Sequence, residues 1–538
     1  MKKVLSIALA LMLAIGMLAG CGGGGETVEQ ADMGAFVETD EKLEISWLSY
    51  YTLSGCDEGT ASELLIEDTF NIEMKPIFTE SGKYNDKKNA LLQSGDIPDL
   101  IYELDPMTVY ADARDEYLLE IPYEVIAKYA PELYKSINDK APAAWAYAYY
   151  EGANYGLPNM NHAHMEGNVA VYRKDWLDKF GFEVPTTIDE LHEVLYAFAN
   201  EDPDGNGKKD TYGYANNSPT YTMYFGEVFG AYGAMPFDWI EKDGEIVYGG
   251  LQEEVVTALS TLAQWYEEGI IYPAFIESVE YGSQLIQSGT VGYCPAASYS
   301  DPNSPDSDEN LLKENFPNGE LVNAKMVRGP EGKFGMRSWG YPCHVVSFGN
   351  KGEESPVKAT KILQILEGMY TNEDLLTEIR LGKEGVTYTR DENGTGTNTF
   401  EATADYVEAS QRRLAGYEFG FAGPTFYSPI TPSEELYQKN LTPSIKEWQA
   451  KYSEIEACLT DLFYKVDIVP SAPTYIQDMR NGQQALMAQI ITGRMDASQY
   501  IPEFTKIWES TGGPIMLEEA KQQGAILDEI YAKIGIEG

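Results

Sequence analysis

Oxygen-bearing side chains recur at alternate positions in residues 202–210. The candidate metal ligands in this run are Asp202, Asp204, Asn206, Asp210 and, through its backbone carbonyl, Lys208. With Gly207 at position 6 to permit a sharp turn, the spacing matches the first nine positions of an EF-hand calcium loop. Position 12, where such loops carry a bidentate glutamate, is Gly213. We expect a structural Ca²⁺ whose shell is completed by water or a ligand from elsewhere; the alternative is a polar turn without metal.

Other groups of chemistry-bearing residues are incomplete. His162, His164 and Glu166 could begin a transition-metal site, but there is no clear further ligand, and an ordinary loop is the simpler interpretation. The chain has no G-x-S-x-G nucleophile motif, no P-loop and no dinucleotide-binding fingerprint. Carboxylate pairs for glycoside hydrolysis remain available among the 85 acidic residues, so that chemistry stays open as an alternative.

The N-terminal residues have the pattern of an export signal that ends at a cysteine. Lys2 and Lys3 precede a mostly apolar run, residues 4–17, which is too short to span a membrane stably. The run leads into Leu-Ala-Gly-Cys21, which resembles a bacterial lipobox. Such sequences are cut before the cysteine, whose thiol carries a diacylglyceryl group that anchors the protein to a membrane. We predict a signal peptide over 1–20 and a lipid on Cys21; the alternative is an ordinary signal peptide with a chance cysteine.

Composition limits the partners of the remaining chain. Residues 21–42 lack a periodic apolar pattern and are expected to form a flexible tether, and the residues that follow are enough for two or three domains. A net charge of −46 disfavours nucleic acid and anionic lipid surfaces. The 38 tyrosines suit wet, half-apolar surfaces such as those that bind sugars. Spacing does not pair the remaining cysteines, so buried thiols and a disulfide both stay open for Cys56, Cys294, Cys343 and Cys458.

Strands and helices are predicted to alternate after the tether. Residues 43–48 alternate as a strand, 61–69 follow as a helix, and 72–77 and 99–102 read as further strands around a helix over 87–93. Repeated units of this kind imply a parallel α/β sheet whose ligand cleft lies at the carboxyl ends of its strands. A second series begins after residue 155, with a strand over 169–172. A later helix starts after Thr186-Thr187, which can cap it, and residues 335–348 form a long strand.

Six phrases in a fixed order carry a family resemblance. They are SGDIPD (94–99), NYGLPN (154–159), YRKDWL (172–177), VPTTIDEL (184–191), YEEGII (266–271) and GKEGVTY (382–388). Together they resemble the extracellular solute-binding lipoproteins of bacterial ABC importers, in the maltodextrin-binding-like branch that includes alginate- and oligosaccharide-binding lipoproteins. The match extends from about residue 43 to at least 390 and weakens beyond about 395.

This resemblance implies an α/β fold of the periplasmic-binding-protein type, in which hinge strands join two lobes that close on a solute. We expect residues 43–157 with 344–423 to form the N-terminal lobe and 158–343 with 424–538 to form the C-terminal lobe. The expected function is to capture a solute, with an oligosaccharide as the favoured class, and deliver it unaltered to ABC permease subunits. The protein is expected to be a monomer on the outer face of the cell membrane, without bound nucleic acid.

Candidate solute contacts follow the strand ends of the first lobe and the crossover strands. They are Tyr50, Tyr51, Glu103, Asn159, Arg337, Trp339 and Tyr341, with Asp105, Trp145, Trp239 and Tyr427 as further possibilities. An aromatic ring can stack on the apolar face of a pyranose while arginine, asparagine or glutamate bonds its hydroxyls. Each aromatic residue could equally serve in the core. Two other functions remain open: a surface glycoside hydrolase, and a sensor or scaffold lipoprotein.

Overall fold

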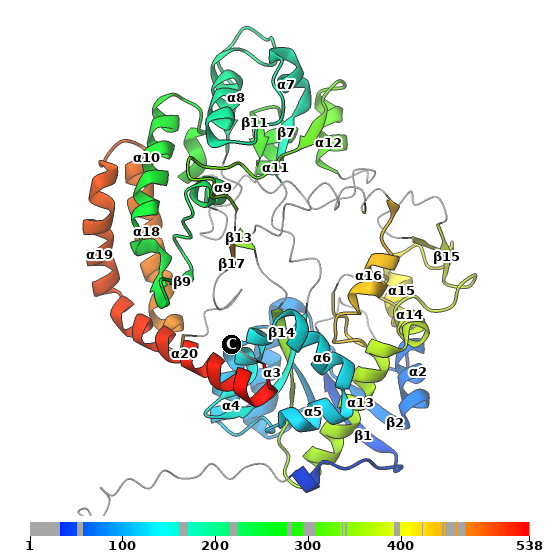
Figure 1. Cartoon of the computed structure of the whole chain (residues 1–538). Helices are drawn as coiled ribbons and strands as arrows, with labels where there is room; N and C mark the ends of the chain where they lie inside the picture. The colour runs from blue at the N-terminus through cyan, green and yellow to red at the C-terminus, as the bar shows by residue number, and fades with distance from the viewer. Residues whose placement is uncertain are drawn as a thin grey trace, which may run out of the picture.

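A computed structural model describes residues 33–50, 58–160, 170–215, 224–276, 282–294, 307–335, 337–338, 342–391, 399–421, 423–443, 446, 459–460 and 469–536. Cys21, Tyr51, Trp339, Tyr341 and the 162–166 histidine segment lie outside these residues. Most described elements gather around two sheets, which Figure 1 shows at the bottom and at the top of the molecule. No helix in the described part of the chain is both long and apolar enough to cross a membrane.

The first sheet contains the predicted β-α-β units. Its strand order is β2-β1-β3-β14-β6. The strands are β1 (Leu43–Leu48), β2 (Ile72–Pro76), β3 (Leu100–Glu103), β6 (Gly156–Met160) and β14 (Pro342–Phe348). β1 pairs in parallel with β2 and β3, whereas β14 is antiparallel to both β3 and β6. The carboxyl ends of β1 and β3 therefore lie at the same edge as the end of β6, which is where solute contacts are predicted.

Helices surround this sheet and form the first lobe with it. They are α2 (Ala61–Phe70), α3 (Tyr84–Ser94), α4 (Met107–Arg114), α5 (Tyr123–Tyr129), α6 (Pro131–Lys140), α13 (Ser355–Thr371) and α14 (Glu373–Leu381), with the 3₁₀ helix η3 (Pro142–Ala148). Local signals set the ends: Thr60 accepts a hydrogen bond from the backbone N–H of Glu63 at the start of α2. Gly95, at φ 83°, ends α3 in the left-handed region that glycine adopts readily. Smaller elements on this side are β15 (Tyr388–Arg390), β16 (Phe400–Ala402), α15 (Ala409–Ala415) and α16 (Glu434–Lys439).

The second sheet has the order β12-β7-β11-β8 and forms the second lobe with its helices. Its strands are β7 (Val171–Arg173), β8 (Tyr212–Tyr214), β11 (Val291–Cys294) and β12 (Leu321–Asn323). The helices are α7 (Lys174–Phe180), α8 (Ile188–Asn200), α9 (Gly226–Ala231), α10 (Glu253–Glu267), α11 (Gly282–Gln287), α12 (Asp308–Asn315), α18 (Ala472–Ile491) and α19 (Tyr500–Ser510), beside the hairpin β9 (Trp239–Lys242) and β10 (Glu245–Tyr248). At α8 the predicted threonine cap is confirmed, because Thr187 and Glu190 form a reciprocal capping box.

The chain between 424 and 440 packs on the first lobe, which differs from the predicted boundary at 423/424. The indole Nε1 of Trp47 donates to the carbonyl of Phe426 at 2.9 Å. On α16, Glu434 forms an ion pair with Lys140, and Lys439 pairs with Glu373 at 2.8 Å. The chain therefore passes from the first lobe to the second lobe only after residue 440. The sequence pattern could not reveal this, because the partner residues Trp47 and Lys140 lie 379 and 294 residues away along the chain.

The predicted long strand over 335–348 is divided. Arg337–Ser338 forms β13, which pairs in parallel with β17 (Leu459–Thr460), while β14 begins at Pro342. A register shift separates the Pro342 and His344 pairs of β14 with β6. The strand of the first sheet is therefore only the second half of the predicted run.

The C-terminal helix α20 (Gly513–Ile534) reaches from one lobe to the other, as Figure 1 shows in red. Near its middle, Gly524 lies so close to Ile246 of β10 that an added Cβ would be 2.4 Å from Cδ1 of that residue. At its end, Lys533 donates to the hydroxyl of Tyr149 at 2.8 Å and to the carbonyl of Gly152. α20 thus ties the second-lobe hairpin to the residues that follow η3 in the first lobe.

Candidate functional site

A cluster of rings lies at the strand ends of the first sheet. Tyr50 lies two residues after the end of β1, and its ring meets that of Tyr102 edge-on, with centroids 5.3 Å apart. The imidazole of His344 on β14 lies 5.4 Å from Tyr102 and 6.2 Å from Tyr50. His344 is oriented by a 2.8 Å hydrogen bond between its Nδ1 and the carbonyl of Leu104. Tyr50 is partly exposed, so it can offer a ring face to a solute.

Asn159 lies in this cluster but has no bonding capacity left for a solute. Its amide nitrogen donates to the hydroxyl of Tyr102 and to the carbonyl of Pro429, both at 2.9 Å. Its amide oxygen accepts from the backbone N–H groups of Met160 and Thr431. The side chain is buried and makes the four bonds that an amide can make. Asn159 therefore fixes Tyr102 and the 429–431 segment, rather than serving as the predicted direct contact.

Glu103 is likewise committed to a buried ion triad. Lys88 of α3 donates to Glu103 at 2.6 Å and to Asp112 of α4 at 2.7 Å. The side chains of Lys88 and Glu103 are each 1% exposed. Burial raises the pKa of Glu103, and the Lys88 ammonium opposes that shift. This predicted contact therefore holds β3, α3 and α4 together beneath the ring cluster, while the nearby Asp105 is exposed and accepts from the N–H of Met107 at the start of α4.

The remaining predicted contacts fall into three groups: one residue forms an ion pair, three are buried, and three lie outside the described residues. Arg337 forms an ion pair with Asp238, with Nε and Oδ1 at 2.7 Å and the two side chains 9% and 4% exposed. Trp145, Trp239 and Tyr427 are all buried and pack among other rings, which is the core role weighed for them. Tyr51, Trp339 and Tyr341 lie outside the described residues, so their contacts remain predictions. Tyr102 and His344 were not predicted, although both occupy the ends of buried strands.

The 202–210 loop has the turns and acidic groups of the predicted metal site. Asp202, Gly205 and Gly207 have φ values of 50°, 74° and 76°, so the chain winds tightly there. The amide nitrogen of Asn206 donates to Asp204 at 2.6 Å and to Asp210 at 3.1 Å. An electropositive group thus already lies between these two carboxylates. Among the described residues, no three histidine, cysteine or acidic side chains converge as a metal cluster.

Asp202 provides the test of whether this loop fits a cation. Its Oδ2 accepts from the N–H of Gly207 at 3.1 Å, but Oδ1 is buried without a hydrogen-bond partner among the described residues. Desolvation raises the pKa of Asp202, but interaction with the side chain of Asp204, the hydrogen bond donated by the N–H of Gly207 and the charge of Lys179 outweigh it and lower the pKa. A charged carboxylate with one unsatisfied oxygen is a ligand that a hard cation such as Ca²⁺ would complete.

A buried acid lies under the second sheet at its other end. Glu227 of α9 is 5% exposed and faces Tyr214 and Tyr293, at the ends of β8 and β11. Burial raises the pKa of Glu227, and the nearby hydroxyl groups of Tyr214 and Tyr293 only partly offset this. The native state thus holds a proton on this group more tightly than the unfolded chain does.

Glu227 predicts a specific pH dependence of stability. Because its folded pKa is raised, the stability that it contributes is fully present below the unfolded pKa and is lost as pH rises through the folded pKa. We expect Glu227→Gln, which keeps the shape but cannot ionise, to gain stability relative to the wild type between acidic and neutral pH. Urea unfolding midpoints of the variant and the wild type, each recorded at an acidic and at a neutral pH, would measure this gain. A deficit of the variant that is equal at both pH values would contradict the assignment.

Comparison with known proteins agrees with this architecture. A family model described as bacterial extracellular solute-binding protein matches residues 65–314. The polygalacturonan/rhamnogalacturonan-binding protein YtcQ of Bacillus subtilis (strain 168) is 26% identical over 97% of this chain and 98% of its own. Lipoprotein LipO of the same organism is 21% identical over 95% and 96% of the two chains. The crystal structure of alginate-binding protein AlgQ2 without calcium ion covers 90% of this chain and 98% of its own, with a TM-score of 0.61 and 18% identity.

These matches confirm the recognition of a bacterial extracellular solute-binding protein. The likeness to AlgQ2 confirms the periplasmic-binding-protein-like α/β fold. The family model is described as a solute-binding protein and YtcQ as a binding protein, and neither is described as an enzyme, which confirms a binding role without catalysis. The glycoside hydrolase alternative therefore finds no support.

Proposed function

We propose that this protein captures an oligosaccharide between its two lobes and delivers it unaltered to the permease subunits of an ABC transporter. The ring cluster of Tyr50, Tyr102 and His344 at the strand ends of the first sheet carries this proposal. Tyrosine and histidine rings offer both a stacking face and a polar edge, which is the combination that a pyranose requires. The name of YtcQ, a binder of plant polysaccharides, supports the carbohydrate class.

Titration calorimetry with oligogalacturonides and neutral gluco- and galacto-oligosaccharides tests the proposal. We expect saturable binding to at least one of these classes. Tyr50→Ala should weaken it about fivefold or more, because a stacked ring contributes on the order of 1 kcal/mol or more. Tyr50→Phe keeps the ring and should bind nearly as the wild type does. Equal affinities of Tyr50→Ala and the wild type would remove Tyr50 from the site.

The proposal includes a structural Ca²⁺ in the 202–210 loop, held by Asp202, Asp204, Asn206, Asp210 and the carbonyl of Lys208. The alternating acids and the unsatisfied Oδ1 of Asp202 support it. The name of AlgQ2 without calcium ion supports a role for calcium in a protein of this fold. Water or another ligand would occupy the place of the missing position-12 glutamate.

Calcium should raise the melting temperature of the wild type, and a chelator should reverse the rise. Calcium at a hundred times its Kd would add about 2.7 kcal/mol of stability. We expect Asp202→Asn to lose most of this response. Asp243→Asn is the matched control, because Asp243 has a similar φ of 56° in an exposed hairpin turn. If calcium does not change the melting temperature of the wild type, the loop is instead a polar turn without metal.

We also propose that the mature chain is a monomer tethered by lipid at Cys21 to the outer face of the cell membrane. The name of LipO, a lipoprotein aligned over nearly its whole length, supports this anchor. The lipobox-like residues before Cys21 would mark the cleavage site, and the thiol of Cys21 would carry the lipid.

A further inference from the structure

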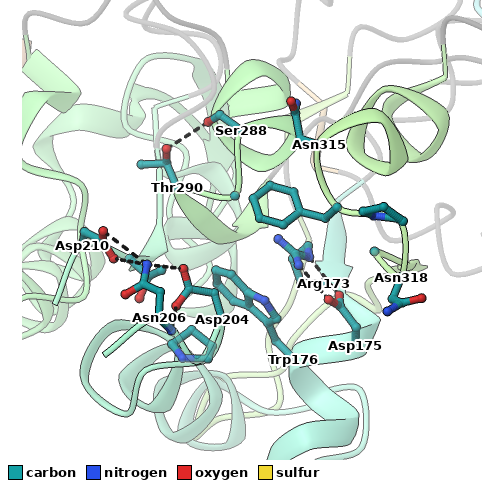
Figure 2. A pocket seen from close by; sticks show the side chains of 16 residues that line it. Arg173, Asp175, Trp176, Asp204, Asn206, Asp210, Ser288, Thr290, Asn315 and Asn318 are labelled. Atoms are coloured by element: carbon teal, nitrogen blue, oxygen red, sulfur yellow. Dashed lines mark hydrogen bonds and ion pairs between the residues drawn. The ribbon is translucent and has the colours of Figure 1, made fainter. Parts of the chain in front are cut away.

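A cavity of about 650 Å³ opens in the second lobe beside the 202–210 loop (Figure 2). Its walls come from the end of β7, the first turn of α7, the loop, the turn before β11 and the residues that follow α12. Ligand-binding pockets in proteins commonly have volumes of about 300–1,000 Å³. The cavity is therefore large enough for one or two sugar units.

Strand directions place this cavity away from the first lobe. Arg173 ends β7 and leads into α7, which Figure 1 shows at the top of the molecule, on the side of the second sheet away from the first sheet. β8 and β11 run parallel to each other, and β11 is antiparallel to β7. Thr211 and Thr290, which precede β8 and β11, therefore share the edge of Arg173, and both line the cavity. A solute held between the lobes would lie at the other edge.

Arg173 gives the cavity an unsatisfied donor. Its Nε and Nη2 donate to Asp175 at 2.8 and 2.7 Å. The guanidinium carbon lies 4.4 Å from the ring centre of Trp176 and 5.0 Å from that of Phe316, so two aromatic rings flank it. The side chain is 2% exposed, and Nη1 has no hydrogen-bond acceptor among the described residues. A buried donor left unpaired destabilises the folded protein, and an acceptor from a ligand would restore the missing hydrogen bond.

The other lining groups select a neutral, polyhydroxylated ligand. The neutral hydrogen-bonding side chains are Asn206, Thr211, Ser288, Thr290, Asn315 and Asn318, and the carboxylates are Asp175, Asp204 and Asp210. Figure 2 shows them arranged around the same space as Arg173. Carboxylates accept from hydroxyl groups, and Nη1 of Arg173 donates to an oxygen. Asp175 already pairs Arg173. In the 202–210 loop, the three aspartates carry one more negative charge than a bound Ca²⁺ neutralises, so an anion is disfavoured.

We propose that this cavity is a second, outer binding site for one neutral sugar unit, separate from the site between the lobes. A ring oxygen or hydroxyl of the sugar accepts from Nη1 of Arg173. Its other hydroxyls bond the asparagine, serine and aspartate side chains. The protein would then bind two saccharide units at independent positions.

Saturation-transfer NMR in calcium-containing buffer tests this site with the methyl β-pyranosides of glucose, galactose and mannose. At least one should show transfer in the wild type that Ser288→Trp abolishes. Ser288 is exposed at the rim, so the indole fills the cavity without disturbing the core. Ser510→Trp is the matched control: in each serine, Oγ donates at 3.0 Å to the carbonyl three residues earlier.

The outcomes separate this inference from the proposed function. Ser288→Trp should leave oligosaccharide binding unchanged, although Tyr50→Ala weakens that binding. Tyr50→Ala should leave the saturation transfer unchanged, although Ser288→Trp abolishes that transfer. Asn318→Ala, an exposed truncation, should reduce the transfer without affecting folding as judged by circular dichroism. Transfer that survives Ser288→Trp, or its absence for all three glycosides, overturns the outer site. Stronger transfer to methyl glucuronide, which is an anion, than to the three neutral glycosides would contradict a site for neutral sugars.

Discussion

Replacing Lys88 by methionine is expected to lower the free energy of unfolding of the first lobe by about 3–5 kcal/mol. The methionine keeps the volume of the side chain but leaves Glu103 and Asp112 without their shared cation. Glu103 is fully buried, and its pKa is already raised by desolvation, so losing the Lys88 charge would raise it further. Urea unfolding, followed by tryptophan fluorescence and circular dichroism, would measure the loss.

Two further variants give this prediction its control. Lys87 precedes Lys88 on α3 but is exposed, so Lys87→Met should change stability by no more than about 0.5 kcal/mol. Adding Glu103→Gln and Asp112→Asn to Lys88→Met removes the unpaired charges and should recover much of the loss. If Lys88→Met proves as stable as Lys87→Met, the triad does not hold the first lobe together.

Replacing Cys21 by serine is expected to release the protein from the membrane. Serine has no thiol to carry a diacylglyceryl group, and the polar residues after it provide no other anchor. Immunoblots of membrane and medium fractions should show the wild type with the membrane and the variant in the medium. Mass spectrometry of the wild type should find a mature chain that begins at a lipid-modified Cys21.

Cys56→Ser is the matched control and should stay with the membrane, because its position lies outside the lipobox-like sequence. Membrane association of Cys21→Ser equal to that of the wild type would contradict the lipid anchor. Cleavage of the wild type at another position, without lipid, would support the ordinary signal peptide.

Local patterns predicted the elements well where neighbouring residues decide them. Thr187 and Glu190 cap α8 through bonds within one helical turn, and the alternation over 43–48 places β1. The strand ends that carry Tyr50, Glu103 and Asn159 do meet at one edge of the first sheet, as the β-α-β order implies.

Roles that depend on distant partners could not be predicted. Asn159 is saturated by Pro429 and Thr431, some 270 residues further along the chain. Glu103 forms a buried ion triad with Lys88 and Asp112, and no sequence motif connects these three residues. The boundary at 423/424 differs for the same reason, because tertiary contacts of Phe426 and α16 hold that segment on the first lobe.

Small-angle scattering of the purified chain from Gly22 onward, recorded with and without the tightest-binding oligosaccharide, tests the central claim most directly. Two lobes that close on a solute should show a smaller radius of gyration in the complex, and chromatography should recover the oligosaccharide intact. An unchanged radius of gyration at saturation would contradict closure between the lobes. Shorter saccharides in the recovered solute would contradict a binding protein without catalysis.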